Sequence, residues 1–210
     1  MEHRRISSAV IRRLPRYYRF LADLQAENIE RISSEELSRR MRVTASQIRQ
    51  DLNNFGGFGQ QGYGYNVGHL RDEIGKILGL DKKHNLIVIG AGNIGRALAG
   101  YSNFERQGFY VKGLFDIDPD VIGVSVRGIP VMHNDQICSF IRDNDIVIAV
   151  IAVSRESAQE IAELVYGCGI RAIWNFAHVD LVIPDDATVE NVHLSESLLT
   201  LSYRLNAPQD

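Results

Sequence analysis

The stretch LIVIGAGNIGRAL, from Leu86 to Leu98, decides the fold of the second half of this 210-residue chain. A run rich in valine and isoleucine leads into glycines at positions 90, 92 and 95, and a helical pattern begins near Asn93. The first glycine permits a tight turn, the second lets the backbone approach a pyrophosphate, and the third lets the helix pack closely on the strand. Free N–H groups at the helix start would face the phosphates. The sequence therefore predicts a dinucleotide-binding turn.

Further apolar runs, separated by amphipathic segments, follow this turn. The expected strands are residues 86–90, 110–116, 145–152, 171–177 and 188–194. The clearest helix between them is Arg155–Tyr166, which has apolar residues along one face. Apolar strands joined by helical crossovers predict an α/β fold with a Rossmann-like, doubly wound parallel sheet.

The strand expected at residues 110–116 ends on an aspartate. A carboxylate there accepts both ribose hydroxyls of NAD and repels a 2′-phosphate, so NAD is favoured over NADP. Its separation from Gly90, twenty-six residues, exceeds the usual spacing of about twenty, and the loop YSNFERQGFY absorbs the excess. Arg96 is either an additional phosphate contact or a solvated arginine. The expected cofactor-binding residues of this region are Gly90, Ala91, Gly92, Asn93, Ile94, Gly95, Arg96 and Asp116.

The overall composition is that of a globular protein, with 45% hydrophobic and 23% charged residues. No apolar run approaches the roughly 20 residues needed to cross a bilayer, and no signal peptide is visible. We therefore expect a cytoplasmic protein without a membrane partner. Cys138 and Cys168 form neither a disulfide framework nor a metal cluster, so we expect reduced thiols and no metal.

The charge is distributed unevenly along the chain. Residues 1–80 contain thirteen Arg or Lys and nine Asp or Glu, a net charge of +4, whereas residues 81–210 contain ten and seventeen, a net charge of −7. A basic half joined to an acidic half indicates nucleic acid as a partner of the basic half. A charged, solvated face is the commoner explanation of such a bias.

The segment RISSEELSRRMRVTASQIRQDLNNFG, residues 31–56, contains two helix starts. Capping boxes at Ser33–Glu36 and Thr44–Gln47 predict short helices beginning near Ser34 and Ala45, joined by a tight turn. Apolar residues spaced i, i+4 give each helix one buried face. This pattern is typical of a helix-turn-helix. An earlier helix is expected over residues 7–26, with a break or kink near Leu14–Pro15, because proline does not fit a helix interior.

A glycine-rich stretch follows these helices. Five of the nine residues from Gly56 to Gly64 are glycine, and Tyr63, Tyr65 and Val67 alternate as in a short strand. A β-hairpin directly after a recognition helix is the wing of a winged helix. A flexible linker is the alternative, but such linkers lack spaced aromatic residues. We expect a winged-helix domain at residues 1–80, a nucleotide-binding domain at residues 81–194 and a C-terminal helix at residues 195–210.

Residues for chemistry on a substrate are not recognisable. A nicotinamide enzyme needs a general acid or base and groups that orient the substrate. The candidates in the second half are His133, His178 and His193, and none has triad or metal-ligand spacing. The last helix carries an apolar stripe, Leu198, Leu201 and Leu205, which favours a partner surface. A small NAD-dependent oxidoreductase with an accessory helical domain is therefore the alternative function.

Together these motifs resemble the Rex family of redox-sensing transcriptional repressors. The similar segments are RLPRYYRFL, SSEELSRR, IRQDLNNFGGFGQQGYGY, IGAGNIGRALAGY, FDID, IWNFA and LLTLSY. The resemblance covers nearly the whole chain and implies a homodimer with exchanged C-terminal helices. It further implies that the dimer binds palindromic operator DNA, that NAD+ supports this binding and that NADH, as an effector, releases it.

The resemblance also implies residue roles. Tyr101 belongs to the surroundings of the nicotinamide, and Arg19 couples the DNA-binding domain to the cofactor domain. His193 stands where the family often has an aspartate, so an Arg19–aspartate bridge cannot form as in other members; Asp180 and Glu196 lie nearby in sequence. The expected DNA-binding residues, on the recognition helix and the wing, are Thr44, Ser46, Gln47, Arg49, Gln50, Gln60, Gln61 and Tyr63.

Overall fold

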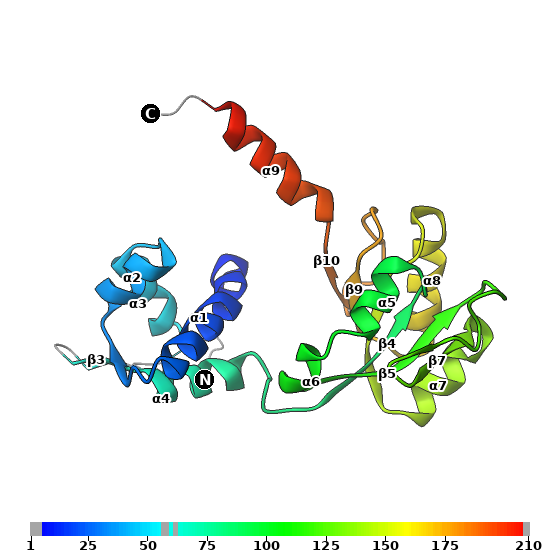
Figure 1. The fold of residues 1–210 in the computed structure, drawn as a ribbon, viewed down its shortest axis with the longest axis horizontal. Helices are drawn as coiled ribbons and strands as arrows, with labels where there is room; N and C mark the ends of the chain where they lie inside the picture. The colour runs from blue at the N-terminus through cyan, green and yellow to red at the C-terminus, as the bar shows by residue number, and fades with distance from the viewer. Residues whose placement is uncertain (1–5, 56–58, 61–62, 208–210) are drawn as a thin grey trace. The chain divides into compact units, whose positions relative to one another are not determined.

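The computed structural model describes residues 6–55, 59–60 and 63–207. The chain forms two compact units that divide between Lys82 and Lys83 (Figure 1). The first unit contains the helices α1 (Ser8–Ala26), α2 (Ser34–Met41), α3 (Ala45–Asn53) and α4 (Val67–Ile77). Its small antiparallel sheet, in the order β1-β3-β2, consists of β1 (Arg31–Ile32), β2 (Gly59–Gln60) and β3 (Gly64–Asn66).

The predicted helix-turn-helix is confirmed in the first unit. The Ser33 hydroxyl accepts a hydrogen bond from the Glu36 N–H at 3.0 Å, and the Thr44 hydroxyl accepts one from the Gln47 N–H at 3.1 Å. These caps satisfy N–H groups that would otherwise lack partners at the starts of α2 and α3. Arg42, with φ at 53°, ends α2 in the left-handed conformation and makes the turn into α3.

Two expectations for the first unit need correction. Of the break or kink expected near Leu14–Pro15, the break was wrong, since α1 continues through Pro15, and the kink stays a prediction. The buried face of α1 runs along both sides of the proline, and its packing against the unit's core outweighs one lost backbone hydrogen bond. The strand around Tyr65 also ends earlier than expected. Val67 begins α4 instead, because the Asn66 side chain caps that helix by accepting from the His69 N–H at 2.8 Å.

The second unit is a doubly wound α/β domain. Its strands are β4 (His84–Ile89), β5 (Phe109–Asp116), β6 (Ser125–Val126), β7 (Ile129–His133), β8 (Ile146–Ile151), β9 (Ala172–Asn175) and β10 (Thr188–Asn191). Its helices are α5 (Asn93–Ala99), α6 (Asn103–Arg106), the 3₁₀ turn η1 (Asn134–Gln136), α7 (Ile137–Asp143), α8 (Arg155–Gly167) and α9 (Leu194–Asn206). The sheet order is β10-β9-β8-β4-β5-β7-β6, and every pairing except β6 with β7 is parallel.

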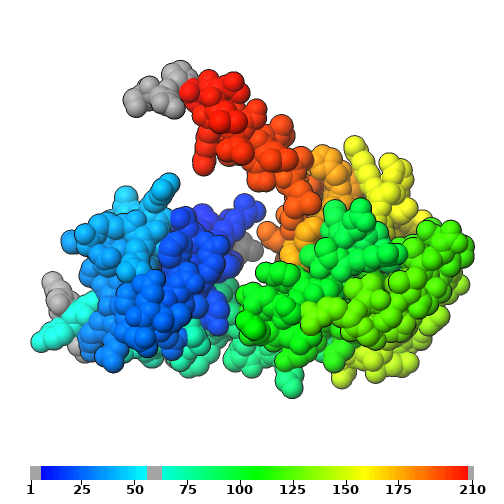
Figure 2. Space-filling model, viewed as in Figure 1, coloured from blue at the N-terminus to red at the C-terminus, as the bar shows by residue number. Residues whose placement is uncertain are grey.

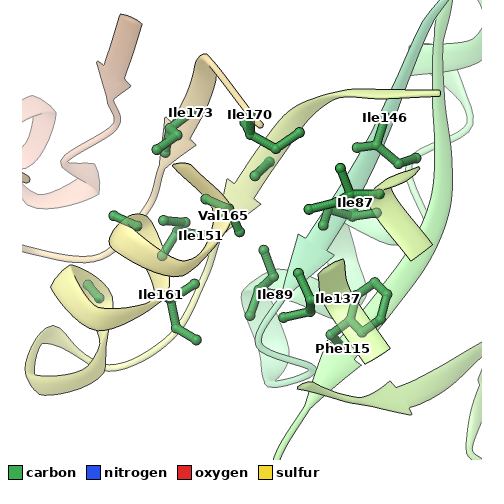
Figure 3. Packing of buried hydrophobic residues seen from close by; sticks show 14 of the residues in the cluster. Ile87, Ile89, Phe115, Ile137, Ile146, Ile151, Ile161, Val165, Ile170 and Ile173 are labelled. Carbon is green, nitrogen blue, oxygen red and sulfur yellow. The ribbon is translucent and has the colours of Figure 1, made fainter. Parts of the chain in front are cut away.

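This order confirms the predicted Rossmann-like sheet, with β4 at its centre and the chain reversing direction across the sheet there. Side chains of β4 alternate between the two faces. Ile87 and Ile89 lie in one buried cluster, which includes Val165 of α8 (Figure 3), and Leu86 and Val88 lie in the other. The strands β6 and β7 were not predicted from sequence, because both are short and β7 contains a proline at position 130.

Cys138 and Cys168 are joined as a disulfide, so the expectation of two reduced thiols is not borne out. Cys138 lies in the first turn of α7 and Cys168 caps the C-terminus of α8. The fold brings their Cα atoms to 5.3 Å, a separation that a disulfide spans. Thirty residues separate them in sequence, and no motif marks them as neighbours.

The last helix, α9, contains no buried residue among positions 194–206. Its apolar stripe is exposed: Leu198 is 67% accessible, Leu201 53% and Leu205 77%. Figure 2, where α9 is red, shows its side chains uncovered on the visible face. Within the described ranges, no helix is long and apolar enough to cross a membrane.

Candidate nucleotide and DNA-binding sites

The glycine loop after β4 is shaped by two close approaches of the backbone, at Gly90 and Gly95. Gly90 has φ at 99°, and a Cβ atom there would lie 2.4 Å from the Ala152 carbonyl oxygen. A Cβ at Gly95 would lie 1.7 Å from the Gly90 carbonyl oxygen, so only glycine lets α5 pack this close to the strand. A Cβ at Gly92, by contrast, would meet no atom within 4 Å. The backbone at Gly92 is therefore open to a ligand.

A cavity of about 760 Å³ lies beside this loop. It is formed where β4, β5, β7 and β8 end, which is where ligands bind in open α/β sheets. Of the residues expected from sequence, Gly90, Gly92 and Asp116 line it. The other polar residues of the wall were not expected as cofactor-binding residues; they are His133, Asn134, Asp135, Ser154, Ser157 and Glu160. They lie at or after the ends of β7 and β8, and only the strand of β8 was predicted from sequence.

Asp116 is held at the cavity by backbone donors. One carboxylate oxygen accepts a hydrogen bond from the Ala91 N–H at 2.5 Å. The other accepts from the N–H groups of Ile117 and Asp118, at 2.7 Å and 3.0 Å. The two carboxylate oxygens have about four lone-pair sites in total, so one acceptor site remains for a ligand. Asp116 can therefore accept a hydrogen bond from a sugar hydroxyl at the edge of the cavity.

Asn134 supplies a second polar group to the cavity. Its side-chain carbonyl oxygen is buried and has no hydrogen-bond partner. An unpaired buried acceptor costs about 1–3 kcal/mol, so such a group usually has a ligand or water as its partner. An amino group on an aromatic ring would satisfy it. Together with the open backbone at Gly92 and the carboxylate of Asp116, this acceptor fits an adenine nucleotide.

The remaining expected cofactor residues do not line this cavity. They are Ala91, Asn93, Ile94, Gly95, Arg96 and Tyr101. Arg96 donates from Nε to the Ala91 carbonyl oxygen at 2.6 Å, so its side chain braces the glycine loop. Tyr101 is 53% exposed and packs edge-on against Phe104, with 4.8 Å between the ring centroids.

In the first unit, the outward face of α3 forms an open, polar hollow. It is lined by Ser46, Arg49, Gln50, Asn53 and Asn54. The last two were not expected from sequence. Arg49 donates to the Ser34 hydroxyl at 2.9 Å, which holds its guanidinium beside the N-terminus of α2. This face offers donors and acceptors of the kinds that read base edges and phosphates.

The other expected DNA-binding residues differ in their exposure and in their hydrogen-bond partners. Thr44 is exposed and caps α3, whereas the Gln47 amide donates to Asp51 at 2.8 Å, inside the unit. Tyr63 is 70% exposed, and its backbone carbonyl accepts from Arg31 at 3.4 Å. Gln61 lies outside the described residues, as does the side chain of Gln60.

Comparison with known proteins identifies both units. Residues 5–53 match the family described as "Putative DNA-binding protein N-terminus", and residues 81–179 match the "CoA binding domain" family. The chain is 58% identical, over 201 residues, to a redox-sensing transcriptional repressor Rex from Caldanaerobacter subterraneus subsp. tengcongensis; the match covers 96% of this chain and 90% of that protein. It is 55% identical to a Rex from Clostridium novyi, with 97% of each covered.

The chain belongs to the Rex family. These relatives are named as repressors and not as enzymes, so the oxidoreductase alternative is not adopted. Solved structures of a Rex-family repressor called RSP are also similar. RSP in complex with β-NAD+ and operator DNA matches with a TM-score of 0.92 and 56% identity, covering 96% of this chain and 93% of RSP. RSP in complex with β-NADH matches with a TM-score of 0.90 and 53% identity, covering 96% and 95%.

Two residues implied by the Rex resemblance can be located. Arg19 is exposed on α1, and its guanidinium carbon lies 5.5 Å from the centroid of the Phe20 ring. His193 precedes α9, and its Nε2 lies 3.7 Å from an Asp180 carboxylate oxygen. The His178 ring packs edge-on against the His193 ring. Asp180, which the sequence could not place, thus supplies a carboxylate beside His193, whereas Glu196 is exposed on α9.

Proposed function

We propose that this protein is a redox-sensing transcriptional repressor that binds operator DNA and is released from it by NADH. The observation that carries the proposal is the match to Rex proteins over 96–97% of the chain, through both units and in the same order. RSP, 56% identical, is known in complex with β-NAD+ and operator DNA. A cytoplasmic location and domains at residues 1–80, 81–194 and 195–210 are part of the proposal.

The nucleotide in this proposal is NAD+ or NADH. Gly90 and Gly92 would receive the pyrophosphate against the backbone, Asp116 the adenosine ribose and Asn134 the adenine amino group. Coenzyme A shares the adenine, ribose and diphosphate but carries a phosphate on that ribose. The Asp116 carboxylate would repel this phosphate, which favours NAD(H) over coenzyme A. Asn93, Ile94 and Arg96 would support the loop, and Tyr101 would lie toward the nicotinamide.

The DNA in this proposal is a palindromic duplex. Ser46, Arg49 and Gln50 would enter the major groove, and Tyr63 with its hairpin would lie against the backbone. A palindrome requires two copies of the reading helix, so the repressor would be a homodimer. The uncovered apolar stripe of α9 supports an exchange of this helix between the two copies.

The switch depends on the difference between the two forms of the nucleotide. The nicotinamide ring is a planar cation in NAD+ and neutral and puckered in NADH. The ligand shifts the protein only by its difference in affinity for the DNA-binding and the released dimer. A shift from 1:99 to 99:1 requires roughly 5.5 kcal/mol of discrimination. Interconversion of the nucleotide is not needed, which is consistent with an effector.

The decisive experiment measures DNA affinity while NAD+ and NADH are titrated separately. The probe is the palindromic duplex that the purified protein selects from a random pool. We expect NADH to weaken binding at least tenfold and NAD+ to maintain it. If both nucleotides bind but neither changes the affinity for DNA, the sensor function is wrong. Steady oxidation of NADH with 2-oxo acids or aldehydes, abolished by a change at Gly92, would instead support an enzyme.

A further inference from the structure

The most unusual buried group outside the nucleotide site is Asp51, which lies on α3. We propose that Asp51 is a positioning residue for DNA readout: it fixes how α3 is rotated against α1, and so which side chains face the DNA. The inference rests on the proposed DNA-binding function of α3. Asp51 itself contacts protein only, because its side chain is fully buried on the face opposite the DNA.

Four hydrogen bonds converge on this carboxylate. Arg13 of α1 donates from Nε and Nη2 at 2.6 Å and 2.7 Å, one to each oxygen. The Tyr17 hydroxyl, also on α1, donates at 2.7 Å. The Gln47 amide donates at 2.8 Å from the preceding turn of α3. Three of the four bonds therefore link α3 to α1, and we call this set the Asp51 clamp.

The charge of Asp51 is maintained by these partners. Burial alone would raise its pKa, but the hydrogen bonds from Arg13, Tyr17 and Gln47 outweigh burial and hold the pKa below its usual value. Burial and the bond to Asp51 raise the pKa of Tyr17, so the hydroxyl remains a donor. The clamp is thus a carboxylate with a guanidinium and a neutral phenol at neutral pH.

The stability of the fold does not by itself explain the Asp51 clamp. A buried ion pair often contributes no more to folding than apolar residues of similar size, because both charges lose their hydration. Among the described residues, Asp51 is the one buried residue with an ionisable carboxyl group. Its neighbours on the buried face of α3, Ile48 and Leu52, already supply apolar contact. What the clamp adds is a fixed orientation of α3 relative to α1.

A short recognition helix needs a fixed orientation about its own axis. Apolar contacts are non-directional, so Ile48 and Leu52 alone tolerate rotation of α3. A bidentate arginine–carboxylate pair fixes both distance and angle. Because the side chains of one helix turn together, holding Asp51 also holds Arg49 and Gln50 on the outward face. Gln47 is one turn before Asp51 on the same side, so it serves the clamp and not the DNA.

The test separates position from stability with an apolar replacement. The double variant Arg13→Met, Asp51→Leu removes the clamp without leaving an unpaired charge. We expect its NADH affinity to stay near that of the wild type and its unfolding temperature to fall slightly, because the buried Tyr17 hydroxyl loses its partner. Its preference for the selected palindrome over a scrambled duplex should fall at least about tenfold, the scale of one base contact. The dependence on salt should not change, because no phosphate contact is lost.

Two further variants complete the design. Tyr17→Phe keeps the shape and the charge pair and should lower the preference by a smaller factor, about two- to fivefold, for the loss of one hydrogen bond. If the double variant does not fold, Tyr17→Phe decides the matter. The matched control is Glu27→Gln, which breaks the exposed Arg40–Glu27 pair of the same unit and should leave the preference unchanged.

A double variant or, failing it, a Tyr17→Phe protein that folds and discriminates as well as the wild type would overturn the positioning role. A wild-type protein that selects no duplex would instead contradict the proposed function, before the clamp is tested. Equal loss of preference in the Glu27→Gln control would also overturn the role, since the effect would then be general to the unit.

Discussion

The outward face of α3 and the nucleotide cavity are built in opposite ways. On α3 the functional groups are side chains, such as Arg49 and Gln50, which project from a helix of nine residues. At the cavity the decisive feature is the backbone of the glycine loop, where neighbouring backbone atoms approach Gly90 and Gly95 closely and Gly92 is left open. A side chain can be exchanged for another with a graded loss, whereas an added Cβ atom at a close approach removes the site. Substitutions should therefore have stepwise effects in the cavity and graded effects on α3.

The largest effect is expected at Gly95. Its replacement by alanine places Cβ against the Gly90 carbonyl oxygen, so α5 must move away from the strand. Overpacking of this kind costs about 1–3 kcal/mol or more. We expect Gly95→Ala to lose NADH binding and to lower the unfolding temperature of the second unit, measured by calorimetry.

Gly92→Ala and Gly167→Ala sharpen this test. A Cβ atom at either position meets nothing within 4 Å, so both variants should fold normally. Gly92→Ala should still weaken NADH binding, because the Cβ occupies space for the ligand, whereas Gly167→Ala should not. Normal NADH affinity in Gly95→Ala would show that the glycine loop is not the nucleotide site.

The next effect is expected at Asp116. Asp116→Ala removes a charged acceptor for the ribose and should weaken NADH binding by about 1–3 kcal/mol. DNA binding without nucleotide should survive, because Asp116 lies in the second unit. Isothermal titration measures the NADH affinity, and a DNA-binding assay without nucleotide measures the affinity for DNA. Asp118→Ala is the matched control, since its carboxylate accepts from the Asp120 N–H at 2.9 Å. A loss in Asp118→Ala alone would assign the ribose to that residue.

On α3 the expected effect is confined to sequence preference. Gln50 is exposed and can pair bidentately with adenine N6 and N7. Gln50→Ala should cost about 1–3 kcal/mol at one base pair of each half-site and leave the salt slope alone. Binding to single-base variants of the operator, measured over a salt series, gives the loss at each base pair and the salt slope. A uniform loss across all sequences would place Gln50 at a phosphate.

The smallest effect concerns the two helix caps. Thr44→Ala and Ser33→Ala each remove an N-cap hydroxyl and should destabilise the first unit by about 1 kcal/mol. Only Thr44 caps the helix that carries Arg49 and Gln50. We therefore expect equal shifts in unfolding temperature but weaker operator binding in Thr44→Ala alone. Equal DNA affinities of the two variants would mean that fraying of α3 does not limit binding.

The two sites also differ in how much the sequence could predict. The glycine loop and Asp116 follow one another in order along a strand, a turn and a strand end, so local sequence was sufficient. Asn134 and Ser157 line the same cavity from η1 and α8, which only the assembled domain brings together. Capping boxes located α2 and α3 because their partners are three residues apart. The partners of Asp51 on α1 are thirty-four and thirty-eight residues away, beyond any local pattern.

The thirteen residues of α9 have a consequence for measurement. A helix of this length is marginal in water without tertiary contacts, and none of the described residues of α9 is buried. In the proposed homodimer, its helical content should therefore obey mass action. Dilution below the dissociation constant of that dimer would melt this segment while the Rossmann sheet stays intact. Ellipticity at 222 nm, followed over a concentration series, would then test the proposed exchange of α9.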